Sequence, residues 1–235
     1  MPVLTEIRQR LSVDDITSSW GMRRARLASH RMTALLSDLL EQIERHNWIQ
    51  PKISFQVHAV VVRTREQFTL RGGYKLSSPM LGHYLPAATH VAAAVCTIGD
   101  AIENEVRAGF AAGDPLRATM LDEIGTLALY RLSDQVEEMI QEEAARLGLE
   151  ASGALNPGED GFPIAQQEIV LALAGGAAIG ISHTTTGMLR PRKSLSMILG
   201  FGNQMRKWSR GERCAVCAAR DRCPHRRSDL VEVAT

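Results

Sequence analysis

Hydrophobic and polar residues alternate with two different periods in the first third of the chain. Over residues 14–48, leucine and isoleucine recur at three- and four-residue spacing, which predicts helix. Residues 52–62 instead alternate apolar and polar positions, as a strand with one buried face does. A hairpin is predicted over 67–76, with its turn at Gly72 and Gly73.

The middle of the chain predicts a buried strand followed by two helices. The strand covers residues 90–99 and contains Cys96, a lone thiol that we interpret as a packing residue. Gly113 ends the first helix, Asp114 caps the second, and Pro115 takes the first turn of the second. The second helix is therefore expected to be long and to bury one leucine- and isoleucine-rich face.

The last third begins with a segment that is unsuited to regular structure. Residues 152–163 contain three glycines and two prolines. A helix is predicted over 164–175, and residues 177–202 predict two strands around a bend at 187–192. Because strands and helices do not alternate strictly, the pattern favours an α+β fold.

The charges are distributed unevenly, although the formal net charge is only +1. Residues 190–227 contain eleven Lys or Arg against two acids, whereas residues 122–150 contain eight acids against two arginines. Such polarity can orient a partner electrostatically. The sequence contains neither a secretory leader nor an apolar run long enough for a membrane helix, so we expect a cytoplasmic protein with no membrane partner.

Three of the four cysteines lie close together near the end of the chain, in "CAVCAARDRCPHRR". The spacing of Cys214, Cys217 and Cys223, with His225 as a fourth ligand, predicts a zinc ion or an iron–sulfur cluster. Free or redox-active thiols and a disulfide pair remain alternatives. The surrounding arginines also fit nucleic acid, but aromatics make up only 5% of the chain, which disfavours stacking on bases.

Motifs for nucleotide hydrolysis, serine hydrolases and zinc proteases are absent from the sequence. His183 stands beside three threonines and is interpreted as a strand residue that makes one hydrogen bond. Glu159 and Asp160 could form an acid/base pair, but an Asp-Gly dipeptide at 160–161 favours a turn.

Three segments, in this order and spacing, are familiar: "NPGEDGFPIAQQE", "IGISHTTTGMLRPRKSLSMILGFG" and the cysteine segment. Together they resemble stand-alone relatives of the activation domain of cobalamin-dependent methionine synthase. The resemblance extends over residues 93–227. It implies a single α+β domain with a twisted antiparallel sheet flanked by helices, plus a C-terminal cysteine knuckle. We expect an N-terminal helical segment (1–50), an activation-domain-like core (51–205) and a basic Cys-rich segment (206–235).

The resemblance also implies a function. The family domain binds S-adenosylmethionine and presents its methyl group to a corrinoid cobalt that a reductase has reduced. The protein positions the reactants and the cofactors supply the chemistry. The implied partners are therefore a corrinoid (cobalamin-binding) protein and an electron donor. The implied cofactor-binding residues lie in two segments: Asn156, Pro157, Gly158 and Glu159; and His183, Thr184, Thr185, Arg190 and Lys193.

Three positions differ from the family pattern. Ala154 replaces an arginine that grips the methionine carboxylate, Glu159 replaces a tyrosine, and Thr185 replaces a glutamate. An alanine offers no charge to a carboxylate, so these changes predict weakened S-adenosylmethionine binding.

Two classes of function follow. One is an accessory protein that docks on a corrinoid protein and supports its reductive reactivation and methyl transfer, with an iron–sulfur or zinc site at its C-terminus. The other is a non-enzymatic assembly module with a structural zinc knuckle. We expect the ligand- and partner-facing cleft at 157–163, 183–186 and 190–193.

Overall fold

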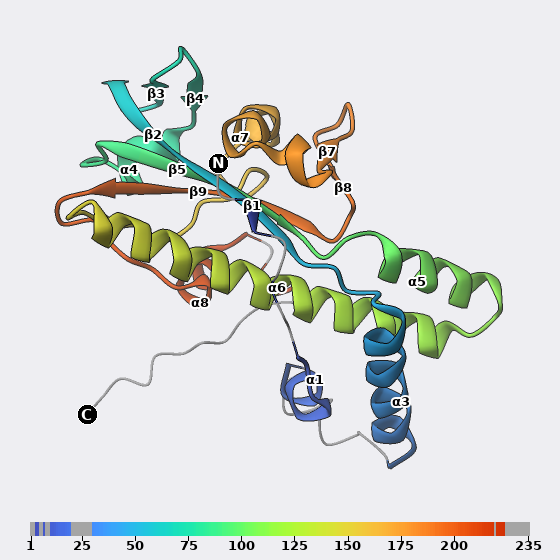
Figure 1. The fold of residues 1–235 in the computed structure, drawn as a ribbon. Helices are drawn as coiled ribbons and strands as arrows, with labels where there is room; N and C mark the ends of the chain where they lie inside the picture. The colour runs from blue at the N-terminus through green and yellow to red at the C-terminus, as the bar shows by residue number, and fades with distance from the viewer. Residues whose placement is uncertain (1–2, 5–6, 8–9, 20–29, 219, 224–235) are drawn as a thin grey trace, which may run out of the picture.

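The computed structural model describes residues 3–4, 7, 10–19, 30–218 and 220–223 (Figure 1). An antiparallel sheet of seven strands forms its centre, in the order β4-β3-β2-β5-β9-β6, with β1 paired to β2. The strands are β1 (Val3–Leu4), β2 (Lys52–Arg63), β3 (Gln67–Leu70), β4 (Lys75–Ser77), β5 (His90–Thr97), β6 (Glu150–Ala151) and β9 (Ser194–Gly202).

Strand β5 lies in the middle of the sheet and shows how the two faces separate. It pairs along its whole length with β2 on one side and β9 on the other. Its side chains alternate between two cores: Ala92, Ala94 and Cys96 point to one, whereas Val91, Ala93 and Val95 point to the other. Cys96 is thus a buried packing residue, as predicted.

Helices cover the first face of the sheet. They are α1 (Val13–Ser19), α3 (His30–His46), α5 (Ala101–Ala111) and α6 (Pro115–Arg146), and α6 runs along the sheet in Figure 1. Helix α6 buries a stripe of apolar residues against this face, including Leu121, Ile124, Leu132, Val136 and Ile140. That stripe recurs at three- and four-residue spacing, as expected for an amphipathic helix on a sheet.

Shorter elements cover the second face. They are α4 (Pro79–Tyr84), the 3-10 helices η1 (Ile164–Gln166) and η2 (Gly176–Ile179), and α7 (Gln167–Ala174). The chain continues after β9 into the short helix α8 (Arg210–Val216). Before this helix, Met205 and Trp208 join the core of the second face.

Most of the predicted elements are confirmed. The fold is α+β with an antiparallel sheet flanked by helices, and the hairpin β3–β4 turns at Gly72 and Gly73, both with positive φ. The Asp114 carboxylate accepts a hydrogen bond from the Arg117 backbone N–H and so caps α6, with Pro115 in its first turn. The predicted helix over 14–48 is observed as α1 and α3, and residues 20–29 lie outside the described part.

Of the two strands predicted over 177–202, the second is confirmed as β9, whereas the first is reduced to two residues and the predicted bend contains a further short strand. Only β9 joins the main sheet, whereas β7 (Ser182–His183) and β8 (Leu189–Arg190) pair with each other in a separate small sheet. The physical reason is a pair of glycines in the left-handed region, Gly175 and Gly180, which enclose the tight helix η2 and interrupt any longer strand. Within the described residues, no helix has the length and apolar character needed to span a membrane.

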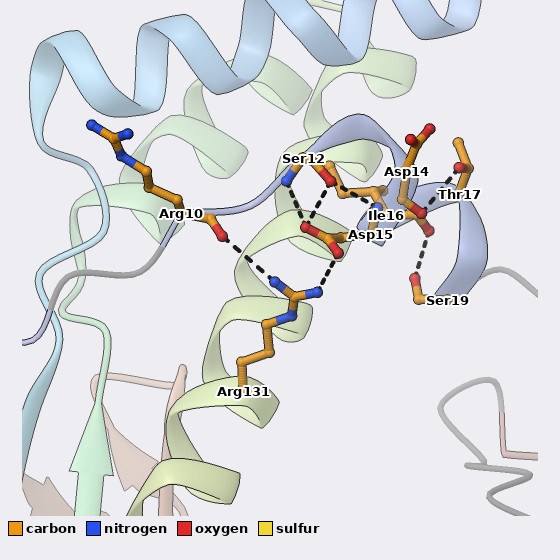
Figure 2. Close-up of polar contacts among 8 residues, drawn as sticks. All are labelled: Arg10, Ser12, Asp14, Asp15, Ile16, Thr17, Ser19 and Arg131. Atoms are coloured by element: carbon orange, nitrogen blue, oxygen red, sulfur yellow. Dashed lines mark hydrogen bonds and ion pairs between the residues drawn. The ribbon is translucent and has the colours of Figure 1, made fainter.

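Helix α1 is fixed to α6 by a polar cluster (Figure 2). Ser12 and Asp15 cap the start of α1 reciprocally: Ser12 donates its backbone N–H to the Asp15 carboxylate, and the Asp15 N–H donates to the Ser12 hydroxyl oxygen. The guanidinium of Arg131, on α6, forms an ion pair with the same carboxylate. Its hydrogen bond, together with those from Ser12, lowers the pKa of Asp15 from 3.8 to about 2.

Candidate ligand cleft

A cavity of about 1490 Å³ lies along the N-terminal half of β9, at the edge of the sheet. Strand β6 and the bridge from Leu155 pair with β9 only over 198–202, so this part of the edge borders the cavity instead. Side chains from α5, α6, the 154–160 loop, the β7–β8 hairpin, β9 and the C-terminal segment line it. It exceeds the roughly 300–1,000 Å³ of ordinary small-molecule sites, so it has room for a ligand and for part of a second molecule.

The 156–160 loop is a compact turn that Phe162 holds in place. The Gly158 N–H donates to the Phe162 carbonyl, and the Phe162 N–H donates to the Glu159 carbonyl. Phe162 is buried in the core of the second face, which anchors the turn. Gly158 has a φ of +94°, a conformation that glycine adopts without steric cost. The four loop residues predicted to bind a cofactor, Asn156, Pro157, Gly158 and Glu159, all line the cavity.

The β7–β8 hairpin forms a second wall and is closed by Thr184. The Thr184 N–H donates to the Met188 carbonyl, and the Met188 N–H donates to the Thr184 hydroxyl oxygen. The tip rests on Ile164: a Cβ added at Gly187 would lie 2.9 Å from Ile164 Cγ1, so glycine permits this close approach. Thr184 and Arg190 line the cavity, whereas the exposed His183 and Thr185 are not among its lining residues.

The Lys193 side chain points away from the cavity, although Lys193 follows the β7–β8 hairpin closely in sequence. Its ammonium lies 2.8 Å from an Asp122 carboxylate oxygen and donates to the Thr126 hydroxyl at 2.6 Å. Both partners are on α6, and the lysine side chain is only 13% exposed. Lys193 therefore joins β9 to α6 and is not among the residues that line the cavity.

The C-terminal segment reaches the cavity because Trp208 fixes it beneath the loop. The Trp208 indole N–H donates to the Ala154 carbonyl at 3.0 Å. The indole lies flat against Gly153, where an added Cβ would approach Trp208 Nε1 to 2.5 Å. The ring also contacts the ring of Tyr84, at 5.1 Å between centroids. Trp208 is thus a buried structural anchor.

Arg213 comes into the cavity from α8, a helix that Ser209 and Glu212 cap reciprocally. Its Nη1 donates to the Tyr84 hydroxyl at 2.9 Å, and its Nη2 donates to a Glu159 carboxylate oxygen at 3.1 Å. The guanidinium also lies over the Tyr84 ring, 5.0 Å from its centroid. Its Nε is buried and has no hydrogen-bond partner among the described residues.

The sequence did not identify Arg213 as a site residue. It stands among many basic residues of the C-terminal segment, and its partners Tyr84 and Glu159 are 129 and 54 residues away. The capping pattern Ser209-x-x-Glu212 is a local signal for α8, but nothing local indicates which face of this helix meets the cavity.

The three predicted metal-ligating cysteines also border the cavity. Cys214 and Cys217 are half-buried and Cys223 is exposed. Within the described residues, however, no group of three or more His, Cys, Asp or Glu side chains is placed to bind a metal ion. The thiols as arranged there do not fit a zinc or iron–sulfur site, and the fourth predicted ligand, His225, lies outside the described residues.

Comparison with known proteins finds a match among solved structures. No family model matches the chain, and no curated protein matches it. A solved structure does: the crystal structure of the MetH reactivation domain bound to AdoHcy superposes with a TM-score of 0.63. The superposition covers 89% of this chain and 81% of that chain, at 12% sequence identity. The likeness establishes a shared fold.

This match agrees with the sequence resemblance to the methionine synthase activation domain at the level of architecture. At 12% identity it says nothing about individual site residues. The residues that line the cavity must therefore carry the functional argument.

Proposed function

We propose that this protein binds an S-adenosyl ligand in the cavity beside β9 and docks on a corrinoid protein, supporting the reductive reactivation of its cobalt. One observation carries the proposal. Two segments chosen from sequence, 156–159 and the stretch that contains Thr184 and Arg190, line the same cavity in a fold shared with a reactivation domain that was crystallised with AdoHcy bound.

The shape of the cavity supports a site for two molecules. Apolar side chains such as Met80, Ile164 and Leu195 line it together with charged groups of both signs. An apolar wall suits a nucleoside, and a volume of about 1490 Å³ leaves space beside such a ligand. In this role the protein brings a methyl donor and a partner-bound cobalt together, and an external electron donor supplies the reducing electron.

The rim of the cavity supports docking. Arg190 and Arg192 lie on the β8 side of the cavity, in the basic part of the chain. Guanidinium groups at such a position suit an acidic protein surface, and their effect falls as salt screens it.

The test mixes the protein with a purified cobalamin-binding protein, an electron donor and S-adenosylmethionine. We expect a complex on a sizing column and a change in the visible spectrum of the cobalamin, both weakened by salt and by Arg190→Glu. Lys193→Met is the matched control, because Lys193 pairs with α6 away from the cavity. Unchanged docking and unchanged spectra in Arg190→Glu at low salt would refute this docking surface.

A further inference from the structure

We propose that Arg213 and Glu159 together bind the amino-acid head group of the ligand, its carboxylate at Arg213 and its ammonium at Glu159. The inference rests on the proposed function and specifies the part of the ligand that the cavity selects. It also assigns a role to an arginine that does not belong to any of the motifs on which the family resemblance rests.

The first step is the state of the Arg213 guanidinium. The Arg213 side chain is only 14% exposed, so most of it is shielded from water. A guanidinium has five N–H donors, and the structure uses Nη1 for Tyr84 and Nη2 for Glu159. The buried Nε has no partner among the described residues. A buried donor without an acceptor is unfavourable, so the side chain is suited to accept a further anionic group, and carboxylates bind guanidinium through two adjacent N–H groups.

The second step is the charge of the pair. Arg213 and Glu159 form an ion pair, so a simple anion would meet the negative charge of Glu159 and a simple cation the positive charge of Arg213. A zwitterion with a carboxylate and an ammonium on one carbon satisfies both. Glu159 is 35% exposed and lies on the loop, which gives its carboxylate freedom to turn toward an ammonium.

The third step is the place of the pair within the cavity. Ala154 corresponds to the arginine that grips a carboxylate in the related family, and Ala154 also lines this cavity. The Trp208 indole N–H donates to the Ala154 carbonyl. The segment that follows Trp208 brings Arg213 within hydrogen-bond distance of Glu159. A guanidinium is therefore supplied to the same loop from a different element, and the missing charge at Ala154 no longer argues against binding.

The test compares two probes by calorimetry. AdoHcy carries the amino-acid head group, whereas 5′-methylthioadenosine carries a methyl group in its place. We expect the protein to bind AdoHcy more tightly, and we expect Arg213→Ala to weaken AdoHcy by about tenfold or more while leaving 5′-methylthioadenosine unchanged. Glu159→Gln should weaken AdoHcy by a smaller factor. Arg220→Ala is the matched control, because Arg220 is 54% exposed on the same segment and does not line the cavity.

The outcomes are distinct. If both probes bind the unaltered protein equally, or if Arg213→Ala leaves AdoHcy binding unchanged, the head-group assignment is wrong and the proposed function survives. If neither probe binds the unaltered protein, the proposed ligand and this assignment both fail. Unchanged binding of 5′-methylthioadenosine by Arg213→Ala shows that the variant is folded, and Arg213→Lys should restore part of the affinity because it restores the charge.

Discussion

Helices α1 and α8, near the two ends of the described chain, are held by the same two kinds of contact but differ in how fully those contacts are satisfied. Helix α1 and helix α8 each begin with a serine and an acid that cap each other, and an arginine–carboxylate pair fixes each region to the core. Around α1, the Asp15 carboxylate accepts from Ser12 and from Arg131 (Figure 2). Around α8, Arg213 lines the cavity and has a buried Nε that finds no acceptor within the part of the chain that the structure describes.

The difference separates a structural ion pair from a binding one. A pair whose groups are all satisfied stabilises the fold and offers nothing to a ligand. A pair that lines a cavity and has an unused N–H donor is suited to a ligand that supplies the missing hydrogen-bond acceptor. Variants around α1 should therefore change stability without changing ligand binding, and variants at Arg213 should do the reverse.

The largest effect on stability is expected where α8 is anchored. In Gly153→Ala the new Cβ meets the Trp208 indole at 2.5 Å, so the ring must move and its hydrogen bond to Ala154 is lost. We expect a loss of about 2–3 kcal/mol in the free energy of unfolding, measured by urea denaturation. AdoHcy binding should fall as well, because Arg213 depends on this anchor.

The double variant Gly153→Ala with Trp208→Leu provides the control. Removing the indole removes the clash, so the two changes should destabilise by less than the sum of their separate effects. Strictly additive losses would contradict the assigned contact.

The next effect is expected at Lys193, which sharpens the comparison. Its cation contacts two α6 residues, as Arg131 contacts α1, so it belongs with the structural pairs. We expect Lys193→Met to cost about 1–2 kcal/mol of unfolding free energy, because it removes charge-assisted hydrogen bonds from a mostly buried ammonium. Arg190→Met should leave the denaturation midpoint unchanged, since Arg190 is exposed at the cavity. Equal midpoints for the two variants would reverse this assignment.

A smaller effect is expected at Asp15, and it depends on pH. Since the folded-state pKa lies near 2, below the ordinary 3.8, the charged form is stabilised in the folded state. The contribution is therefore complete above about pH 4 and lost as the pH falls toward about 2. Solvent screening reduces it, because the side chain is 30% exposed, and we expect Asp15→Asn to cost about 1 kcal/mol at pH 7.

Denaturation of both proteins at pH 7, 5 and 3 measures this contribution. The gap between the midpoints should be the same at pH 7 and 5 and should narrow at pH 3, and AdoHcy binding at pH 7 should be the same for both. A gap that widens as the pH falls would contradict the lowered pKa.

The smallest effect on the metal-free protein is expected at the cysteines, which border the cavity without joining either core. The sequence predicts that Cys214, Cys217 and Cys223 bind one metal or cluster, whereas the described residues contain no group placed to bind one, so metal analysis decides between the two. Each Cys→Ser change should then lower the metal content of anaerobically purified protein, which elemental analysis measures. A brown sample would indicate an iron–sulfur cluster and a colourless zinc-containing sample a structural zinc. Full occupancy in the triple variant would refute the prediction.

The sequence predicted local features of the fold well because their causes are local. The strand over 52–62, the cap at Asp114 and the turn at Gly72 and Gly73 each follow from a few adjacent residues, although burial along β2 does not alternate as the pattern predicts. Within 177–202 it predicted the second strand, but it did not predict how short the first one is, because glycines on both sides of η2 interrupt it. In the cavity it identified the 156–159 loop, but it grouped Lys193 with Arg190 although their side chains point to different places. Arg213 was missed because its role depends on contacts across the fold.

One further consequence comes from helix α6, whose 32 residues extend about 48 Å at 1.5 Å per residue. Two consecutive residues on it face different regions: Tyr130 lines the cavity and Arg131 pairs with Asp15 of α1. A rotation of the helix about its axis that shifts one of them shifts the other. One turn of the helix therefore carries both a part of the cavity wall and the residue that holds the N-terminal cap.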